Sequence, residues 1–193
     1  MESRTSEDSP IRVDCVPEGA LGLPEGSGTL GMTFAPGMKD IGWNREVATD
    51  LAALRDEYGT DILVSLMEDF EYNVYHMNGE RSFFESATAA GMEVVRFPIV
   101  DVDVPREEQA EEFADLVGGI IGSLRDGKKV VAHCRGGIGR TGTVAASVLV
   151  GLGHDADNAI EIVRRARSPR MVETWPQEEY VREFAEKYRG RWG

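Results

Sequence analysis

The sequence predicts an α/β fold: a single domain with a central, mostly parallel sheet flanked by helices. Short apolar runs typical of buried strands alternate with longer segments that carry apolar residues at helical spacing. Hydrophobic residues make up 41% and charged residues 28% of the 193 residues, which is close to the globular average. Because we find neither an internal repeat nor a linker, we expect a flexible tail over residues 1–9 and one domain over residues 10–193.

Five segments are predicted to be strands of this sheet. The clearest is 61–67, a nearly continuous apolar run of the kind found in sheets covered on both faces. The first alternates only weakly and is predicted to be an edge strand; the loop 17–28, rich in glycine and proline, follows it. In chain order, the predicted strands are 10–16, 29–34, 61–67, 92–99 and 129–133.

The segments between and after these strands are predicted to be helices. The first begins at a cap on Asn44 and ends near Tyr58, since Gly59 follows. Pro105 suits the first position of another helix, whose apolar stripe extends to Leu124. The predicted helices are 44–58, one within 81–90, 105–124, 141–151, 156–167 and 175–189.

The composition restricts the classes of partner and compartment. The formal net charge of −13 disfavours general binding to nucleic acid or acidic lipid, although a local positive pocket remains compatible with it. The two cysteines, Cys15 and Cys134, are too few for a secreted disulfide framework and lack zinc-ligand spacing. The polar N-terminus does not resemble a signal peptide, and the longest apolar run, 144–152, is too short to span a membrane. We therefore expect a cytoplasmic protein without a metal, cofactor, nucleic acid or membrane partner.

The segment from Cys134 to Gly142 has the strongest chemical signal. It follows a predicted strand and precedes an apolar helix, which is where open α/β sheets bind ligands. Four of the residues 136–142 are glycines, which allow successive backbone N–H groups to turn inward and bind an anion. Arg140 at a helix N-terminus is unfavourable by about 0.3–1 kcal/mol unless an anion lies between the two. The same positive surroundings favour the thiolate of Cys134.

This one loop would therefore supply a nucleophile and a cradle for an oxyanion. The arrangement suits attack of the Cys134 thiolate on phosphorus, giving a covalent phosphocysteine. Arg140 and the backbone N–H groups of 135–140 would hold the transition-state oxygens. The leaving oxygen needs a general acid as well, because an alkoxide or phenoxide leaves poorly.

The same residues form the C-x5-R-[ST] signature of the protein tyrosine phosphatase superfamily. The chain resembles its dual-specificity branch and looks most like the cyclin-dependent-kinase-associated phosphatase family and its bacterial relatives. The resemblance covers about residues 11–187 and includes 30–37, 61–64, 97–101 and 172–177. It implies a phosphomonoester hydrolase without metal or cofactor, acting on phosphotyrosine and also on phosphoserine or phosphothreonine in proteins.

The resemblance also implies a role for each matching position. Cys134 matches the nucleophile, Arg140 the phosphate clamp, and Asp101 the general acid that then assists attack by water. Thr141 matches the hydroxyl that stabilises the departing thiolate, and His133 matches the residue that helps keep the cysteine ionised. The residues expected to bind the substrate are Arg135, Gly136, Gly137, Ile138, Gly139 and Arg140.

Several of these roles have structural alternatives. Asp103 lies two residues after Asp101 and is the alternative acid. Thr141 can serve only as a helix cap, and His133 only as a core histidine. Arg135 occupies a variable loop position, where a basic residue can favour a substrate with extra negative charge.

Three further features of the sequence have both a functional and a structural interpretation. Glu173 and Gln177 resemble positions beside the phosphate loop, with a polar helix start as an equal alternative. The acidic residues of 68–71 are expected to lie in a solvated loop, with contact to the pocket rim as the alternative. Cys15 is expected to be structural, with a reversible disulfide to Cys134 as the alternative.

Other functions compete with protein dephosphorylation. A phosphate-binding adaptor without turnover would keep the same loop. A rhodanese-type sulfurtransferase also begins its active loop with cysteine, but residues 140–142 and Asp101 fit that class poorly. Within the phosphatases, a phosphoinositide, an RNA 5′ end or another non-protein substrate is the alternative.

Overall fold

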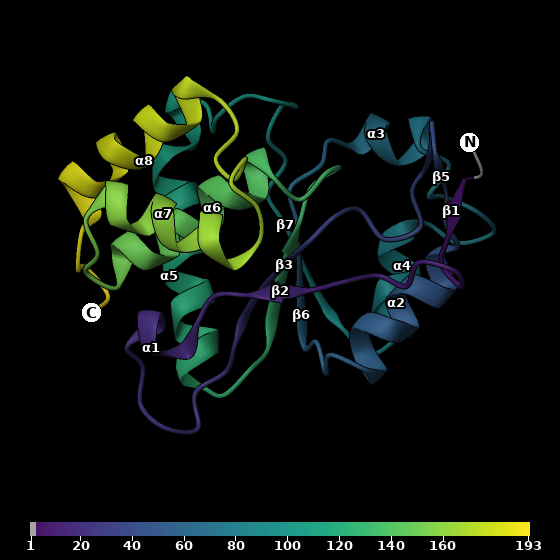
Figure 1. Ribbon diagram of the computed structural model, residues 1–193, viewed down its shortest axis with the longest axis horizontal. Coiled ribbons are helices and arrows are strands. Elements are labelled where there is room, and N and C mark those ends of the chain that lie inside the picture. Colours follow the sequence, from purple (N-terminus) through teal and green to yellow (C-terminus); the bar gives the residue numbers. More distant parts are fainter. Residues whose placement is uncertain (1–2) are drawn as a thin grey trace.

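The computed structural model describes residues 3–193 and has a five-stranded sheet at its centre (Figure 1). The strand order is β2-β3-β8-β6-β7; only β2, at one edge, runs antiparallel to its neighbour. The predicted α/β class and mostly parallel sheet are therefore confirmed. The strands are β2 (Asp14–Cys15), β3 (Leu30–Thr33), β8 (Val130–His133), β6 (Ile62–Ser65) and β7 (Glu93–Arg96).

Helices cover both faces of this sheet, which explains why every residue of β3, β6 and β8 is buried. In Figure 1, α5 to α8 lie on one side of the sheet and α2 and α4 on the other. Two separate apolar cores result, one on each face. The helices are α1 (Glu18–Leu21), α2 (Val47–Asp56), α3 (Asp69–Val74), α4 (Phe83–Ala89), α5 (Ala110–Arg125), α6 (Gly139–Gly151), α7 (Ala156–Ala166) and α8 (Trp175–Tyr188), and a 3-10 turn spans Glu107–Gln109.

Helix α6 positions the predicted phosphate loop, because it begins directly after that loop. All of its residues are buried, since it is packed between the sheet and the other helices of its face. It begins at Gly139, two residues before the predicted start at 141. The first turn of α6 therefore includes Arg140 and Thr141 within the protein interior.

Local sequence signals explain where several helices begin. At α4, Ser82 accepts a bond from the N–H of Glu85, whose side chain bonds back to the N–H of Ser82. At α8, Thr174 and Gln177 form the same reciprocal pair. The helix predicted over 44–58 instead begins at Val47, because Asn44 belongs to a strand. The loop 17–28 contains the short helix α1, and the predicted edge strand 10–16 is reduced to β2.

The N-terminal segment differs from the predicted flexible tail. Strand β1 (Arg4–Thr5) pairs with β5 (Trp43–Asn44), which also pairs with β4 (Lys39–Asp40), giving a small second sheet. The fully buried Arg45 beside this sheet donates to the carbonyl oxygen of Ser9 at 2.6 Å. Residues 3–9 are thus attached to the body of the protein by a buried guanidinium that needs acceptors. Residues 1–2 of the predicted tail lie outside the described residues.

Asp50 completes the anchoring of this segment. Its carboxylate accepts two bonds from Arg45, both 2.7 Å long, and a third from the N–H of Gly37 at 2.8 Å. The pair is almost completely buried, so loss of either partner would leave an uncompensated charge in the interior. The ion pair therefore fixes the small sheet and the chain after β3 in one position.

Among residues 3–193, none of the helices combines the length and the apolar composition that crossing a lipid bilayer requires.

Candidate active site

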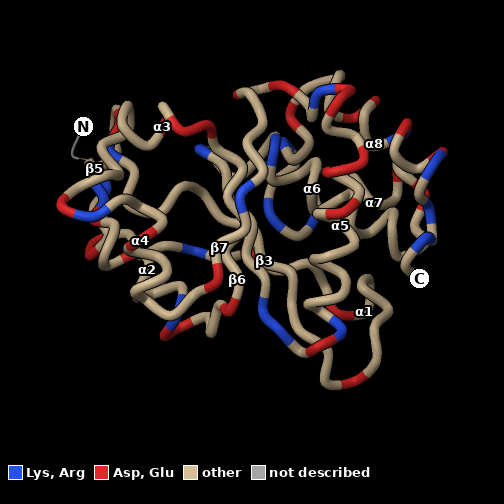
Figure 2. The backbone as a smooth tube through the Cα atoms, turned by 180° about the vertical axis from the view of Figure 1, so that it is seen from behind, with Lys and Arg blue, Asp and Glu red and all other residues tan. Residues whose placement is uncertain are grey.

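The predicted phosphate loop lies in a pocket of about 760 Å³ at the carboxyl ends of the sheet strands. Cys134, Arg140 and Asp101 all line this pocket, so the fold brings together three residues that the sequence analysis singled out. Acidic positions are spread over both halves of the molecule, whereas several basic positions gather beside α6 (Figure 2). The basic lining residues are Arg12, Arg135, Arg140, Arg167 and Arg170.

The backbone of the loop is held from its outer side. The carbonyl oxygens of residues 135–138 all bond to groups outside the ring. Ala35 N–H binds the first at 3.0 Å, Arg167 binds the next two, and Gly142 N–H binds the last at 3.0 Å. Because a trans peptide is planar, its N–H points opposite to its carbonyl oxygen. The N–H groups that follow these carbonyls therefore face the inside of the loop.

The Cys134 sulfur lies inside this ring. The N–H of Gly137 donates to Sγ at 3.2 Å. Among the described residues, it is the only N–H of 135–140 that has an acceptor. Gly137 has a φ of 66°, and a Cβ at this position would lie 2.1 Å from the carbonyl oxygen of Thr33. Only glycine fits there, as the sequence pattern indicated.

Arg140 is held beneath the loop with its side chain only 1% exposed. Its Nη1 and Nη2 donate to the two carboxylate oxygens of Glu71 at 2.7 and 3.0 Å, and Nη1 also donates to the Ile99 carbonyl oxygen at 3.0 Å. Burial lowers the pKa of Arg140, but the hydrogen bonds that it donates to Glu71 and nearby negative charges outweigh this effect, so the net shift of the pKa is upward. The guanidinium is therefore a permanent cation. Its Nε is buried without a partner in the described part of the chain.

Glu71 is a residue of the site that the sequence analysis placed in a solvated loop, and that expectation was wrong. Segment 69–74 forms helix α3, which carries Glu71 toward the interior, where it is 2% exposed. Its Oε2 also accepts a bond from the N–H of Glu68 at 2.8 Å. The one available signal was the acidic residue three positions after Glu68, typical of a capping box. Nothing local indicated its partner, because Arg140 lies far along the chain.

Asp101 and Asp103 occupy different environments. Asp101 lines the pocket, and its Oδ1 accepts a bond from Arg140 Nη2 at 2.8 Å. Asp103 is exposed, and its carboxylate accepts only from the N–H of Val104 among the described residues. Val102 between them has a φ of 58°, a strained backbone conformation for a β-branched residue. That turn separates the two carboxylates, which an extended chain would have placed on the same side.

The buried Gln177 fixes the loop that carries Asp101. Its Nε2 donates to the carbonyl oxygen of Asp103 at 3.0 Å, and its Oε1 accepts from the N–H of Glu173 at 3.0 Å. Glu173 itself is exposed and lines the pocket. Gln177 therefore caps the N-terminus of α8 together with Thr174 and connects this helix to the loop of Asp101.

The side chains of His133 and Thr141 lie next to the loop. Both ring nitrogens of His133 and the Thr141 hydroxyl are buried without a hydrogen-bond partner. The His133 ring packs beside Phe83, with centroids 5.6 Å apart. Burial lowers the pKa of His133 to about 3, so it contributes no positive charge to the loop near neutral pH.

This neutral histidine predicts a pH effect on stability. Below its unfolded pKa of about 6.5, the unfolded chain binds a proton at His133 and the folded chain does not. As the pH falls from 6.5 to 3, the free energy of unfolding should therefore decrease by about 1.4 kcal/mol per pH unit. Urea unfolding at several pH values measures this slope, which His133→Gln should reduce and the exposed-site variant His76→Gln should not. An unchanged slope in His133→Gln would contradict the assignment.

The variable residues of the loop have separate environments. Arg135 is bonded to Asp40 on β4, and its guanidinium lies 5.0 Å from the ring centre of Tyr75. The Arg135 hydrogen bond lowers the pKa of the Asp40 carboxyl. Arg135 therefore joins the loop to the small sheet, and its charge is already paired. Gly136, Ile138 and Gly139 line the pocket directly.

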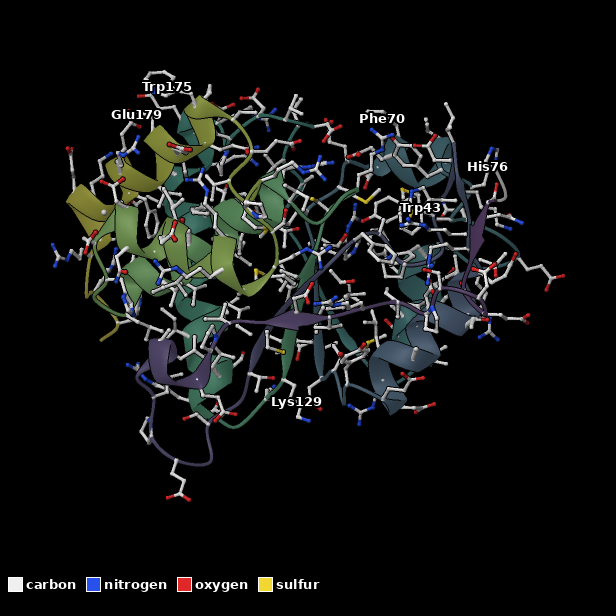
Figure 3. All side chains as sticks on the ribbon, in the orientation of Figure 1. Trp43, Phe70, His76, Lys129, Trp175 and Glu179 are labelled. Carbon is white, nitrogen blue, oxygen red and sulfur yellow. The ribbon has the colours of Figure 1, made fainter. Side chains whose placement is uncertain are left out.

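Cys15 lies on the edge strand β2, which β3 separates from β8, at the level of Val131, three residues before Cys134. Cys15 pairs with Gly31 across β2 and β3, and Lys129 is among the charges close enough to affect its thiol. Figure 3 shows Lys129 at one edge of the molecule and Trp43, which lines the pocket, toward the other. A disulfide between the two cysteines is incompatible with this arrangement.

One wall of the pocket is apolar and comes from the small sheet and the chain before it. Phe34 and Trp43 pack against each other at a centroid distance of 5.0 Å, above the buried Arg45. Ile41, at the turn between β4 and β5, is 96% exposed beside them. The pocket thus has a ring of backbone N–H donors on one side and an apolar wall beside it. No group of His, Cys, Asp and Glu in the described chain is arranged to hold a metal ion.

Comparison with known proteins places these observations in a family. A family model described as "Polymorphic toxin system, DSP-PTPase phosphatase" matches residues 36–154. Cyclin-dependent kinase inhibitor 3 of Rattus norvegicus is 26% identical over 188 residues, covering 96% of this chain and 84% of that protein. An uncharacterized protein of Methanocaldococcus jannaschii is 39% identical over 90 residues, covering 47% of this chain and 58% of that protein. This chain therefore spans little more than half of the archaeal relative.

Solved structures share the fold. Kinase associated phosphatase, with its catalytic-site cysteine substituted by serine, has a TM-score of 0.83 at 22% identity over 93% of this chain and 97% of that one. Tk-PTP in its active form has a TM-score of 0.66 at 29% identity over 84% of this chain and 95% of that one. Fold and pocket together define a cysteine-based phosphatase, a phosphoric monoester hydrolase of the dual-specificity class. The chain belongs to the DSP-PTPase family of polymorphic toxin systems, within the protein tyrosine phosphatase superfamily.

Proposed function

We propose that this enzyme dephosphorylates proteins, with phosphotyrosine as the main substrate and phosphoserine or phosphothreonine as further ones, through a phosphocysteine on Cys134. The observation that carries the proposal is the ring of inward N–H groups around Sγ, closed by the cationic Arg140. The N–H groups of Gly136, Ile138 and Gly139, which face inward and have no acceptor among the described residues, match the oxygens of a phosphoryl group. The unpartnered Nε of Arg140 supports the same ligand.

In the first step, the Cys134 thiolate attacks phosphorus and the bond from phosphorus to the leaving oxygen breaks. Asp101 gives its proton to that oxygen, so an alcohol or phenol departs. The N–H groups of 135–140 and the Arg140 guanidinium hold the three equatorial oxygens. The product of this step is a phosphocysteine and an ionised Asp101.

In the second step, water attacks the phosphocysteine and gives a proton to Asp101. The bond from sulfur to phosphorus breaks, and Cys134 leaves as a thiolate beside the Gly137 N–H. Thr141 is proposed to stabilise this thiolate, since its buried hydroxyl has no other partner among the described residues. His133 has the smaller role of packing beneath the loop as a neutral ring.

The substrate preference follows from the pocket wall. Phe34, Ile41 and Trp43 offer an apolar surface beside the donor ring, which suits the aromatic ring of phosphotyrosine. We assign the catalytic domain to residues 10–193, with residues 3–9 attached to it through β1 and Arg45. We assign the site of action to the cytoplasm, in keeping with an acidic chain containing two free cysteines.

Phosphate release from a substrate panel tests this proposal. The panel contains phosphotyrosyl and phosphoseryl peptides, an inositol phospholipid, a 5′-phosphorylated RNA and an aryl phosphate. We expect the phosphotyrosyl peptides to have the highest kcat/KM. Preference for the lipid or RNA would replace the proposed substrate class, and tight peptide binding without phosphate release would indicate an adaptor.

Asp101→Asn is expected to lower kcat by about 10²–10³-fold, because the leaving oxygen then departs without a proton. The loss should be greatest for phosphoserine and smallest for p-nitrophenyl phosphate, whose leaving group needs no acid. The matched control is Asp103→Asn, which should keep a rate near that of the wild type. If steady-state phosphate release instead falls in Asp103→Asn and stays near the wild-type rate in Asp101→Asn, Asp103 is the general acid.

A further inference from the structure

Arg167 lies on the outer side of the phosphate loop, and no sequence pattern singled it out. It follows the last residue of α7, and its side chain is only 9% exposed. Its Nε donates to the carbonyl oxygen of Gly137 at 2.7 Å, and its Nη2 to that of Gly136 at 3.4 Å. The guanidinium thus binds two successive carbonyl groups of the ring.

These two contacts set the direction of two N–H groups. The plane of each trans peptide fixes the following N–H opposite to the bound carbonyl oxygen. Binding of the Gly136 carbonyl therefore turns the N–H of Gly137 inward, where it meets Sγ at 3.2 Å. Binding of the Gly137 carbonyl turns the N–H of Ile138 inward in the same way.

The guanidinium is itself anchored at its other end. Nη1 donates to Asp14 Oδ2 at 2.8 Å and to the carbonyl oxygen of Met32 at 3.1 Å. These acceptors lie on the neighbouring strands β2 and β3. Burial lowers the pKa of Arg167, and the Asp14 carboxylate opposes that shift. Arg167 therefore connects the sheet edge to the loop through a planar fork with little freedom to move.

The fit of Arg167 against the loop also depends on glycine. A Cβ at Gly137 would lie 2.8 Å from Arg167 Nη2. The guanidinium can therefore approach the loop this closely only because residue 137 has no side chain. A buried cation costs desolvation energy that an apolar residue would not, so stability alone gives no reason for an arginine here.

We propose that Arg167 is a positioning residue for dephosphorylation, which holds the N–H groups of Gly137 and Ile138 toward the phosphoryl group from behind the loop. This inference rests on the proposed function of the loop as the phosphate cradle. Arg167 does not touch the reacting atoms in this arrangement. It acts through the backbone that does.

The test compares Arg167→Met with Arg164→Met. Arg164 lies three residues earlier, on α7, and is also partly buried; it donates to the Met171 carbonyl oxygen at 3.1 Å and pairs with Glu178, but it makes no bond to the loop itself. For Arg167→Met we expect kcat for an aryl phosphate to fall about 10–100-fold, somewhat less than direct loss of a transition-state donor. The inhibition constant of inorganic phosphate should rise about tenfold over the same range. Arg164→Met should change both values by less than about threefold. We expect the two variants to lose a similar amount of melting temperature, so a difference in kcat is not a difference in stability.

One further variant, Arg167→Lys, keeps the test decisive. Arg167→Lys retains the charge but not the fork, so it should recover only part of the lost kcat. If Arg167→Met does not fold, Arg167→Lys decides: a loss of at least about fivefold in kcat supports the proposal. Wild-type kcat and phosphate inhibition in a folded Arg167→Met or Arg167→Lys would overturn it.

Failure of the proposed function would give a different result. If the wild type releases no phosphate from any substrate, phosphate binding is measured directly by calorimetry. Weaker phosphate binding in Arg167→Met than in Arg164→Met would then support the positioning role without any turnover. Equal binding in the two variants would overturn it.

Discussion

Cys134→Ser is expected to lower the rate of aryl phosphate hydrolysis by at least about 10⁴-fold, the scale seen when a catalytic nucleophile is removed. The serine hydroxyl has the same place in the ring of N–H groups but is not ionised at neutral pH, so it attacks phosphorus poorly. The ring itself is unchanged, because its carbonyls are bound from outside the loop. Inorganic phosphate should therefore still bind to the variant.

Steady-state phosphate release and phosphate calorimetry on the same preparation measure the two expectations. Cys15→Ser is the matched control, because Cys15 is the other free thiol among the described residues and does not line the pocket. It should keep the wild-type rate. Retention of most activity by Cys134→Ser would remove the phosphocysteine from the mechanism.

Arg140→Ala is expected to lower kcat/KM by about 10³–10⁵-fold, by analogy with other arginines that neutralise a transferring phosphoryl group. The guanidinium lines the same pocket as Cys134, and its raised pKa keeps it positively charged. Its loss also leaves Glu71 buried and unpaired, which should destabilise the fold by about 3–5 kcal/mol. Rate and stability are therefore both affected, and one variant alone does not separate them.

The double variant Arg140→Ala/Glu71→Ala separates the two effects. Removing both partners eliminates the unpaired charge, so urea unfolding should show that much of the lost stability returns. Phosphate release should stay as low as in Arg140→Ala. A double variant with restored activity would show that Arg140 acts only by neutralising Glu71.

The parts of the fold and site that were predictable have local signals. The strand at 61–67 is a continuous apolar run, and the residues from Cys134 to Gly142 contain the loop's glycines, its cysteine and its arginine in one segment. Capping residues such as Ser82 lie within three positions of their partners. In each case the interacting groups are close in sequence, so their spacing can be recognised from the sequence alone.

The parts that were not predictable depend on distant partners. Glu71 meets Arg140 across 69 positions, and Arg167 meets Gly137 across 30. The strands β4 and β5 are two residues long, too short for an alternating pattern, and they are stabilised by the buried Arg45 and Asp50 instead. Such contacts are set by packing and charge compensation in three dimensions, which a single sequence does not display.

The attachment of residues 3–9 matters for anyone who shortens this protein for expression. A clone trimmed at Pro10 would lose the Ser9 and Thr5 carbonyl groups that accept bonds from Arg45. It would also lose β1, one of the two strands that pair with β5, and with it part of the support for the apolar wall that Trp43 forms beside the catalytic ring. Residues 3–9, which the sequence alone predicts to be a flexible tail, should therefore be kept.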